Sequence, residues 1–232
     1  MKELIIVMPV FNEQASVRKV ILEWFQEIEN WTEDFTFLVI NDGSRDETLA
    51  NLYRLHKQLG PRLEIIDREN RGHGASCLQG YAIACERSAQ WVLQLDSDGQ
   101  CDPQYFFRLW RLREKNDVIY GYRYRRDDGW RRSVASFVLK SVLFCCAGVY
   151  CADANVPYRL MRTKGLLEIV QRVPSDFFLS NVALAVLLRR AGWRQATAPI
   201  HFRERYGGEP SVALTKFGSK AFELVSQLKK LK

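Results

Sequence analysis

The segment of this sequence best suited to chemistry is D-S-D-G-Q, which runs from Asp96 to Gln100. Carboxylate and amide oxygens are ligands that Mg²⁺ or Mn²⁺ prefers, and a cation held there would suit the oxygens of a diphosphate. A D-x-D segment can also be a simple turn after a strand. Here it directly follows an apolar run at 91–95, and N-D-G-S, which begins at Asn41, follows an earlier run in the same way. This placement favours the metal-binding interpretation.

Five arginines within ten residues form a second candidate site, suited to phosphate. A planar guanidinium donates two parallel, charge-assisted hydrogen bonds to a phosphate. A single arginine is more often a solvated surface charge, but the density of this group favours phosphate binding. The group comprises Arg123, Arg125, Arg126, Arg131 and Arg132.

Apolar runs alternate with helix-like stretches over the first 120 residues, and they predict the elements that position these groups. Runs typical of strands buried in a parallel sheet occur at 4–9, 35–40, 63–67, 91–95 and 118–122. Helix-like stretches lie between them at 16–28, 46–59, 74–89 and 103–115. The alternation predicts an α/β fold with a doubly wound, mainly parallel sheet, which binds ligands at the carboxyl ends of its strands.

The second half of the chain is less regular. We expect an apolar helix at 133–152, a strand near 155–161, a helix at 178–191, an extended stretch at 195–203 and a C-terminal helix after Ser211. No linker and no internal repeat divides the sequence, so we expect a single domain over residues 1–232.

Composition and charge narrow the classes of partner. The 232 residues, 47% of them hydrophobic, are enough for one sizeable core, and the net charge of +7 suggests a phosphate-bearing partner such as a nucleotide, a nucleic acid or an anionic membrane. The N-terminus does not resemble a signal peptide, and the six cysteines show no C-x-x-C spacing. We therefore expect reduced thiols and a cytoplasmic location.

Four motifs, in this order and spacing, resemble the inverting family 2 glycosyltransferases with the GT-A fold. They are P-V-F-N-E from Pro9, N-D-G-S from Asn41, R-G-H-G-A from Arg71 and D-S-D-G-Q from Asp96. Within the family, the likeness is greatest to dolichol-phosphate mannose synthase and the polyprenyl-phosphate glycosyltransferases. The resemblance implies a Rossmann-like sheet flanked by helices, with a nucleotide-sugar-binding half at 1–122 and an acceptor-side half at 123–232.

The same resemblance implies an enzyme that moves a sugar from a nucleotide-diphosphate donor to a polyprenyl or dolichyl phosphate at the membrane surface, with Mg²⁺ or Mn²⁺ as cofactor. GDP-mannose is the favoured donor, and UDP-sugars are the alternative. The basic residues adjoin a metal motif and an apolar helix rather than a nucleic-acid-reading module, so nucleic acid is not expected as a partner.

Roles carry over residue by residue from the family motifs. The expected donor-binding residues are Pro9, Phe11, Glu13, Ile40, Asp42, Gly74, Asp96, Ser97, Arg123 and Arg205. The expected metal ligands are Asp98, Gln100 and Asp96, and the expected acceptor-phosphate residues are Arg131, Arg132 and Ser211. The expected catalytic residues are Asp96, Asp98, Asp153 and Arg123.

Two motifs depart from the family pattern. Pro157 stands where the family has a glycine, and proline cannot adopt a left-handed backbone conformation. Val212 stands where a phosphate-binding lysine is expected, and one extra residue precedes Ser211. One phosphate contact of the family is therefore in doubt in this chain.

The acceptor remains open between two chemistries. A phosphate acceptor is already ionised and needs no strong base, whereas a sugar hydroxyl in a surface glycan needs one, for which Asp153 is the candidate. Asp153 could equally be a helix cap. A third hypothesis, a non-catalytic nucleotide-sugar-binding subunit, is disfavoured by the intact set of Asp96, Asp98 and Gln100.

Two segments are candidates for membrane contact without a transmembrane helix. The stretch 131–152 fits either a buried helix or an interfacial helix flanked by Trp130 and arginines. The segment 211–232 carries an apolar stripe with lysines beside it, which fits either packing on the domain or peripheral association with the cytoplasmic membrane face.

Overall fold

The computed structural model describes residues 2–123, 148, 153–174, 177, 179–207 and 217–231, except for the side chains of 217–222. Within these residues the chain forms a seven-stranded sheet with the strand order β3-β2-β1-β4-β6-β5-β7. The strands are β1 (Leu4–Val10), β2 (Phe35–Asp42), β3 (Leu63–Arg68), β4 (Trp91–Gln94), β5 (Val118–Arg123), β6 (Arg159–Arg162) and β7 (Gln195–Ile200). The predicted mainly parallel α/β sheet is confirmed.

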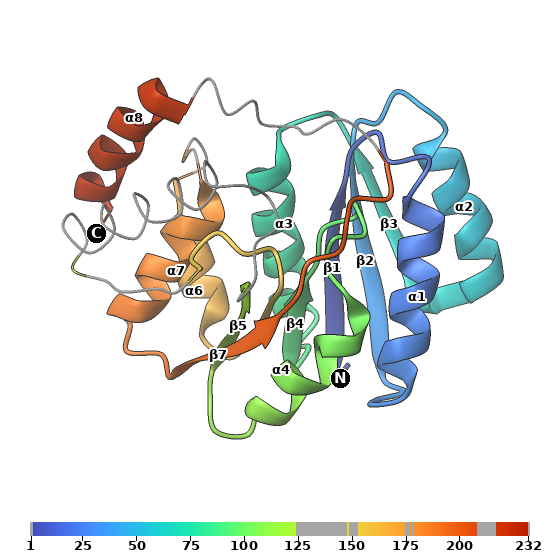
Figure 1. The fold of residues 1–232 in the computed structure, drawn as a ribbon, viewed down its shortest axis with the longest axis horizontal. Helices are drawn as coiled ribbons and strands as arrows, with labels where there is room; N and C mark the ends of the chain where they lie inside the picture. The colour runs from blue at the N-terminus through green and yellow to red at the C-terminus, as the bar shows by residue number, and fades with distance from the viewer. Residues whose placement is uncertain are drawn as a thin grey trace.

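Helices cover both faces of this sheet (Figure 1). Their bounds are α1 (Val17–Glu29), α2 (Thr48–Leu59), α3 (His73–Glu86), α4 (Phe106–Leu112), α6 (Leu166–Gln171), α7 (Ser180–Arg190) and α8 (Phe217–Lys230). Helices α1 and α2 lie on one side of the sheet in Figure 1, and α3, α6 and α7 lie on the other. Trp24 of α1 makes edge-on ring contacts with Phe106 and Tyr158, which places the start of α4 on the α1 side.

The hydrophobic pattern explains how β1 and α1 pack. Every residue of β1 is buried, as expected for a strand covered on both faces. The apolar positions of α1 recur at helical spacing, and those from Val17 to Ile28 all face the core. On the other face, α3 is rich in small residues because it lies close to the sheet: a Cβ at Gly80 would overlap the Val7 side chain.

Two features of the second half were not predicted from the sequence. Strand β6 is antiparallel to both β4 and β5 and lies between them. The first residue of β6, Arg159, therefore lies at the edge of the sheet where the parallel strands end. The turn that precedes β6 lies at the same edge. Helix α6 was not predicted, because six residues that follow the left-handed Gly165 are too few to show a helical period. The expected helix at 133–152 lies outside the described residues, apart from position 148.

The C-terminal stripe packs on the domain where the structure describes it. Leu224, Leu228 and Leu231 of this stripe are buried and belong to the main hydrophobic core. Arg190 of α7 donates a hydrogen bond to the Leu231 carbonyl, which ties the end of the chain to the second helical layer. No helix in the described part of the chain has the length and apolar character needed to cross a membrane.

Candidate active site

A cavity of about 470 Å³ opens at the carboxyl ends of β1, β2 and β4. Loops after these strands and the loop after β3 form its walls, together with the start of α3 and one residue of the C-terminal half. The lining residues are Pro9, Val10, Phe11, Asn12, Glu13, Asp42, Asn70, Gly72, His73, Ser76, Asp96, Ser97, Asp98 and Arg205. The strand-end motifs thus converge on one edge of the sheet, as the sequence predicts.

The loops after β1 and β2 are tied together and hold Phe11 at the cavity. Asn12 adopts a left-handed backbone conformation with φ of 53°, which asparagine tolerates better than most residues. Its N–H donates to Ser44 Oγ at 3.0 Å, and its Oδ1 accepts from the Arg45 N–H at 2.8 Å. The neighbouring Phe11 keeps 44% of its surface exposed, unlike most aromatic residues of this chain. An exposed ring on a fixed loop is suited to stacking against a flat base.

Asp42 shapes the wall of the cavity through four hydrogen bonds from the protein. Its Oδ1 accepts from Arg68 Nε at 3.0 Å, from Arg68 Nη2 at 2.7 Å and from the Arg71 N–H at 3.0 Å. Its Oδ2 accepts from the Gly72 N–H at 2.8 Å. A carboxylate offers about four acceptor positions. Oδ1 accepts three of these hydrogen bonds and Oδ2 only one, so Oδ2 is the oxygen with room to accept a hydrogen bond from a nucleoside.

Asp96 and Asp98 place two carboxylates after β4 in the cavity lining. Burial and the negative charge of Asp96 raise the pKa of Asp98 to about 6. Asp98 Oδ1 accepts from the Gln100 N–H at 3.0 Å, which folds the loop around this carboxylate. Across the described residues no cluster of three or more His, Cys, Asp or Glu side chains could hold a metal ion. The two oxygen donors nevertheless fit a hard divalent cation that completes its shell with diphosphate oxygens.

Arg205 supplies a positive charge to this acidic site from the far end of the chain. Its Nη2 donates to Glu13 Oε1 at 2.5 Å, and its Nη1 lies 3.7 Å from Asp98 Oδ2. The Tyr206 N–H donates to the Asp98 carbonyl at 3.0 Å, so residues 203–207 lie against the D-S-D-G-Q loop. Gly99, with φ of 82°, meets the Tyr206 ring so closely that a Cβ would overlap it.

His73 at the start of α3 contacts the acidic site from another side. Its Nε2 lies 2.9 Å from Asp96 Oδ1. Cys77 on the next turn of the helix and the Asp96 carboxylate raise the pKa of His73 well above its usual value. His73 therefore places a basic side chain beside Asp96.

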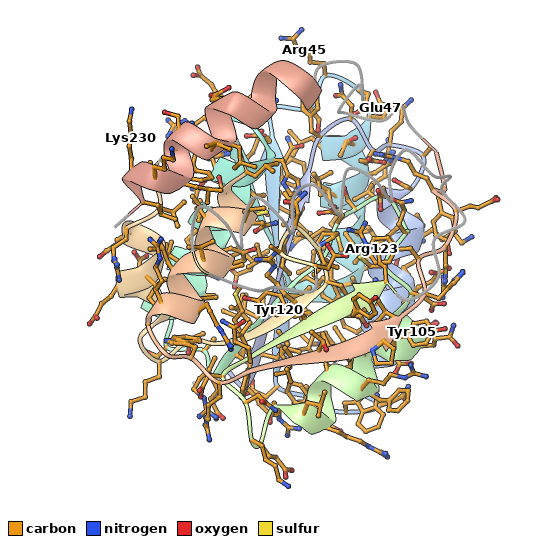
Figure 2. All side chains as sticks on the ribbon, turned by 60° about the vertical axis from the view of Figure 1, so that its left-hand side comes forward. Arg45, Glu47, Tyr105, Tyr120, Arg123 and Lys230 are labelled. Carbon is orange, nitrogen blue, oxygen red and sulfur yellow. The ribbon has the colours of Figure 1, made fainter. Side chains whose placement is uncertain are left out.

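Arg123 and Asp153 form a bidentate ion pair beyond the cavity lining. Arg123 Nε donates to Asp153 Oδ2 at 2.7 Å, and Arg123 Nη2 donates to Oδ1 at 2.9 Å. Figure 2 shows Arg123 at the tip of β5, with Tyr120 further back on the same strand. The pair thus joins the end of β5 to the turn before β6.

A family model described as glycosyl transferase family 2 matches residues 5–170 of this chain. The match extends from β1 to the end of α6 and includes every strand-end motif that lines the cavity. The chain belongs to glycosyltransferase family 2.

Solved structures with a similar fold include glucosyl-3-phosphoglycerate synthase from Mycobacterium tuberculosis. Its complex with Mn²⁺, UDP and phosphoglyceric acid matches with a TM-score of 0.70 and 17% identity, over 99% of this chain and 78% of that chain. Its complex with phosphoglyceric acid matches with a TM-score of 0.68 and 16% identity, over 99% and 79%. A mycobacterial protein matches with a TM-score of 0.67 and 17% identity, over 98% and 73%. These likenesses confirm the predicted GT-A fold of this family 2 member.

The cavity brings together many of the residues expected from the family motifs. These are Pro9, Phe11, Glu13, Asp42, Asp96, Ser97, Asp98 and Arg205. Asn70 and Ser76 also line it and were not expected. Ser76 lies one helical turn after His73, so the period of α3 could have indicated it; Asn70 lies in a loop and had no such signal.

Other expected residues that the structure describes lie outside the cavity lining. Ile40 is completely buried within β2, and Gly74 packs closely against Ser180 of α7. Gln100 contributes its backbone to the Asp98 loop, and Arg123 is paired with Asp153. The expected acceptor residues Arg131, Arg132 and Ser211 lie outside the described residues.

Proposed function

We propose that this family 2 glycosyltransferase transfers a sugar from a nucleoside-diphosphate donor to a polyprenyl phosphate, with inversion and with Mg²⁺ or Mn²⁺. The observation that carries the proposal is the composition of the cavity. One edge of the sheet combines the exposed ring of Phe11, the carboxylates of Asp96 and Asp98 and the guanidinium of Arg205. A base, a metal-bound diphosphate and its negative charge require these three kinds of group.

Different residues of the cavity would bind the base, the diphosphate and the metal ion of the donor. Phe11 stacks on the base, and Arg205 moves from Glu13 to donate hydrogen bonds to the diphosphate. A divalent cation on Asp96 and Asp98, with Gln100 as the third expected ligand, would neutralise the charge that develops on the departing nucleoside diphosphate. The complexes of the structurally similar synthase with Mn²⁺ and UDP support this division.

A phosphate acceptor agrees with the state of Asp153. Both carboxylate oxygens of Asp153 accept hydrogen bonds from Arg123, so the pair is arranged to hold a guanidinium in place rather than to remove a proton. An acceptor phosphate oxygen, already ionised, would attack the anomeric carbon while the bond from that carbon to the β-phosphate oxygen of the donor breaks. The structurally similar synthase was solved with glucosyl-3-phosphoglycerate, a ligand that also carries a phosphate.

The sequence resemblance favours GDP-mannose as donor, whereas the structurally similar synthase was solved with UDP-glucose. The proposal covers both bases, and the assay decides between them. Purified full-length protein would be incubated with polyprenyl phosphate in detergent, Mn²⁺ and each radiolabelled donor in turn. We expect a lipid-linked labelled product with one donor, and none after EDTA treatment.

The matched variants are Asp98→Asn and Asp34→Asn. Asp98→Asn removes a proposed metal ligand and should abolish transfer. Asp34→Asn makes the same chemical change at an exposed aspartate paired with Lys2 at the opposite edge of the sheet, and should leave transfer unchanged. If no donor yields a lipid product, or if Asp98→Asn matches the wild type, the proposed function is wrong. A product that forms only on a sugar hydroxyl and disappears in Asp153→Asn would instead favour a glycan acceptor.

A further inference from the structure

Arg159 is the sole buried arginine or lysine among the residues that the structure describes, and its side chain has no exposed surface. It begins β6, opposite Gln94 of β4 and Tyr120 of β5, in the middle of the sheet. A buried charge is costly unless hydrogen bonds compensate it. Among the described ion pairs, none includes Arg159.

Backbone carbonyls take the place of a carboxylate around Arg159. Its Nε and Nη2 donate to the Val156 carbonyl at 3.1 and 2.8 Å, and Nη2 also donates to the Ala154 carbonyl at 3.0 Å. Its Nη1 donates to the Asn181 carbonyl in α7 at 3.1 Å. The guanidinium carbon also lies 5.4 Å from the centre of the Tyr120 ring. One cation thus holds a turn and a helix in a fixed relation.

The turn that Arg159 holds carries Asp153. The Val156 N–H donates to the Asp153 carbonyl at 3.2 Å, which closes the turn. The Gly121 N–H donates to the Tyr158 carbonyl at 2.7 Å and joins the turn to β5. Asp153 in turn accepts two hydrogen bonds from Arg123 at the tip of β5. Hydrogen bonds thus run from Arg159 through the turn and Asp153 to Arg123.

A buried polar path also links Arg159 to the cavity. The Tyr81 hydroxyl lies 3.1 Å from Asn181 Oδ1 and 2.6 Å from Gln94 Oε1. Gln94 Nε2 donates to Cys77 Sγ at 3.5 Å, one helical turn from His73. Hydrogen bonds thus connect the turn that contains Asp153 to α3, the helix whose first residue, His73, lines the cavity.

We infer that Arg159 is a positioning residue, which fixes the turn at 153–156 and with it the Arg123–Asp153 pair relative to the bound donor. The inference rests on the proposed function, because it assigns the pair to the acceptor side of that reaction. Loss of Arg159 should leave donor binding intact while it misplaces the groups that orient the acceptor. Misplacement by about 1 Å can cost on the order of 100-fold in rate.

The test compares Arg159→Met and Arg159→Lys with Arg162→Met. Arg162 is at the other end of β6, where it pairs with Asp117 at 3.3 Å and lies over the Trp91 ring. In the transfer assay we expect both Arg159 variants to lose about 10- to 100-fold in kcat, with a nucleotide Kd within about twofold of the wild type. Arg162→Met should change neither quantity. Arg159→Lys keeps the charge but cannot span three carbonyls, so it serves if Arg159→Met does not fold.

Hydrogen exchange of the peptide that contains Val156 supplies a readout independent of transfer. We expect faster exchange of this amide in Arg159→Lys than in the wild type or Arg162→Met. Unchanged exchange, an unchanged kcat, or equal losses of kcat and nucleotide affinity would overturn the inference. If the wild type transfers no sugar while exchange responds as expected, the proposed function fails and the positioning of the turn stands.

Discussion

Asp98 combines burial with a neighbouring negative charge, and both raise its pKa to about 6. The folded protein therefore binds this proton more tightly than the unfolded chain does. The contribution of Asp98 to the free energy of unfolding falls as the pH rises from about 4 through 6, and it stays low above that range. A cation bound to the ionised Asp98 carboxylate would offset this cost and stabilise the folded protein.

Asp98→Asn should stabilise the metal-free protein at pH 7.5 by about 1–3 kcal/mol, because the amide carries no charge to bury. The difference from the wild type should disappear near pH 4. Urea unfolding at both pH values measures it, with Asp34→Asn as the control. Equal stabilities of Asp98→Asn and the wild type at pH 7.5 would contradict the raised pKa of Asp98.

At the scale of elements, the D-S-D-G-Q loop depends on residues 203–207. Tyr206 is held by Glu23 of α1, whose Oε2 lies 3.0 Å from the hydroxyl, and by Lys19, whose Nζ lies 3.8 Å from the ring centre. Its ring lies against Gly99, which leaves no room for a side chain. The position of Asp98 is therefore coupled to a segment more than one hundred residues away.

Gly99→Ala should lower the melting temperature and weaken nucleotide binding in the presence of Mn²⁺ by about tenfold or more, because a methyl group would displace Tyr206 and the loop. The matched control is Gly192→Ala. Gly192 also has a positive φ, of 75°, but open space where its Cβ would lie, so only a backbone cost of about 1–2 kcal/mol is expected. Thermal melts and nucleotide titrations of both variants separate the two effects. Equal nucleotide affinities in the two variants would contradict the coupling.

The elements of the first 123 residues could be predicted well from the sequence because their signals are local. Helix α1 showed its buried face in the spacing from Val17 to Ile28, and β1, β2 and β4 each ended in a recognisable polar motif. The direction of β6 was not predictable, since a strand of four residues reads alike in both directions. The contact of Arg205 with Glu13 joins residues 192 positions apart, and the role of Arg159 depends on carbonyls that carry no sequence signal.

At the scale of the whole molecule, the C-terminal helix closes the second helical layer. Leu228 has no exposed surface, whereas Lys230 is exposed and projects from α8 at the edge of the molecule (Figure 2). The apolar stripe of α8 thus contributes to the core in its described part. Lys229 and Lys230 are exposed, and we predict that they can contact an anionic surface.

Leu228→Ala should destabilise the protein by about 2–4 kcal/mol, because it opens a cavity in the core. Lys230→Ala should change stability by less than about 0.5 kcal/mol. Urea unfolding of both variants checks this, and sedimentation with anionic vesicles checks the alternative. A Leu228→Ala variant with full stability but no vesicle binding would show that the stripe faces lipid.

We propose that the cavity after β1, β2 and β4 holds a nucleoside diphosphate together with a divalent cation. Calorimetric titration of UDP and of GDP into the full-length protein, with and without Mn²⁺, tests it most directly. We predict binding of one nucleotide that is at least about tenfold tighter with Mn²⁺, and loss of this metal effect in Asp98→Asn but not in Asp34→Asn. Binding of neither nucleotide, or a metal effect that persists in Asp98→Asn, would contradict the account.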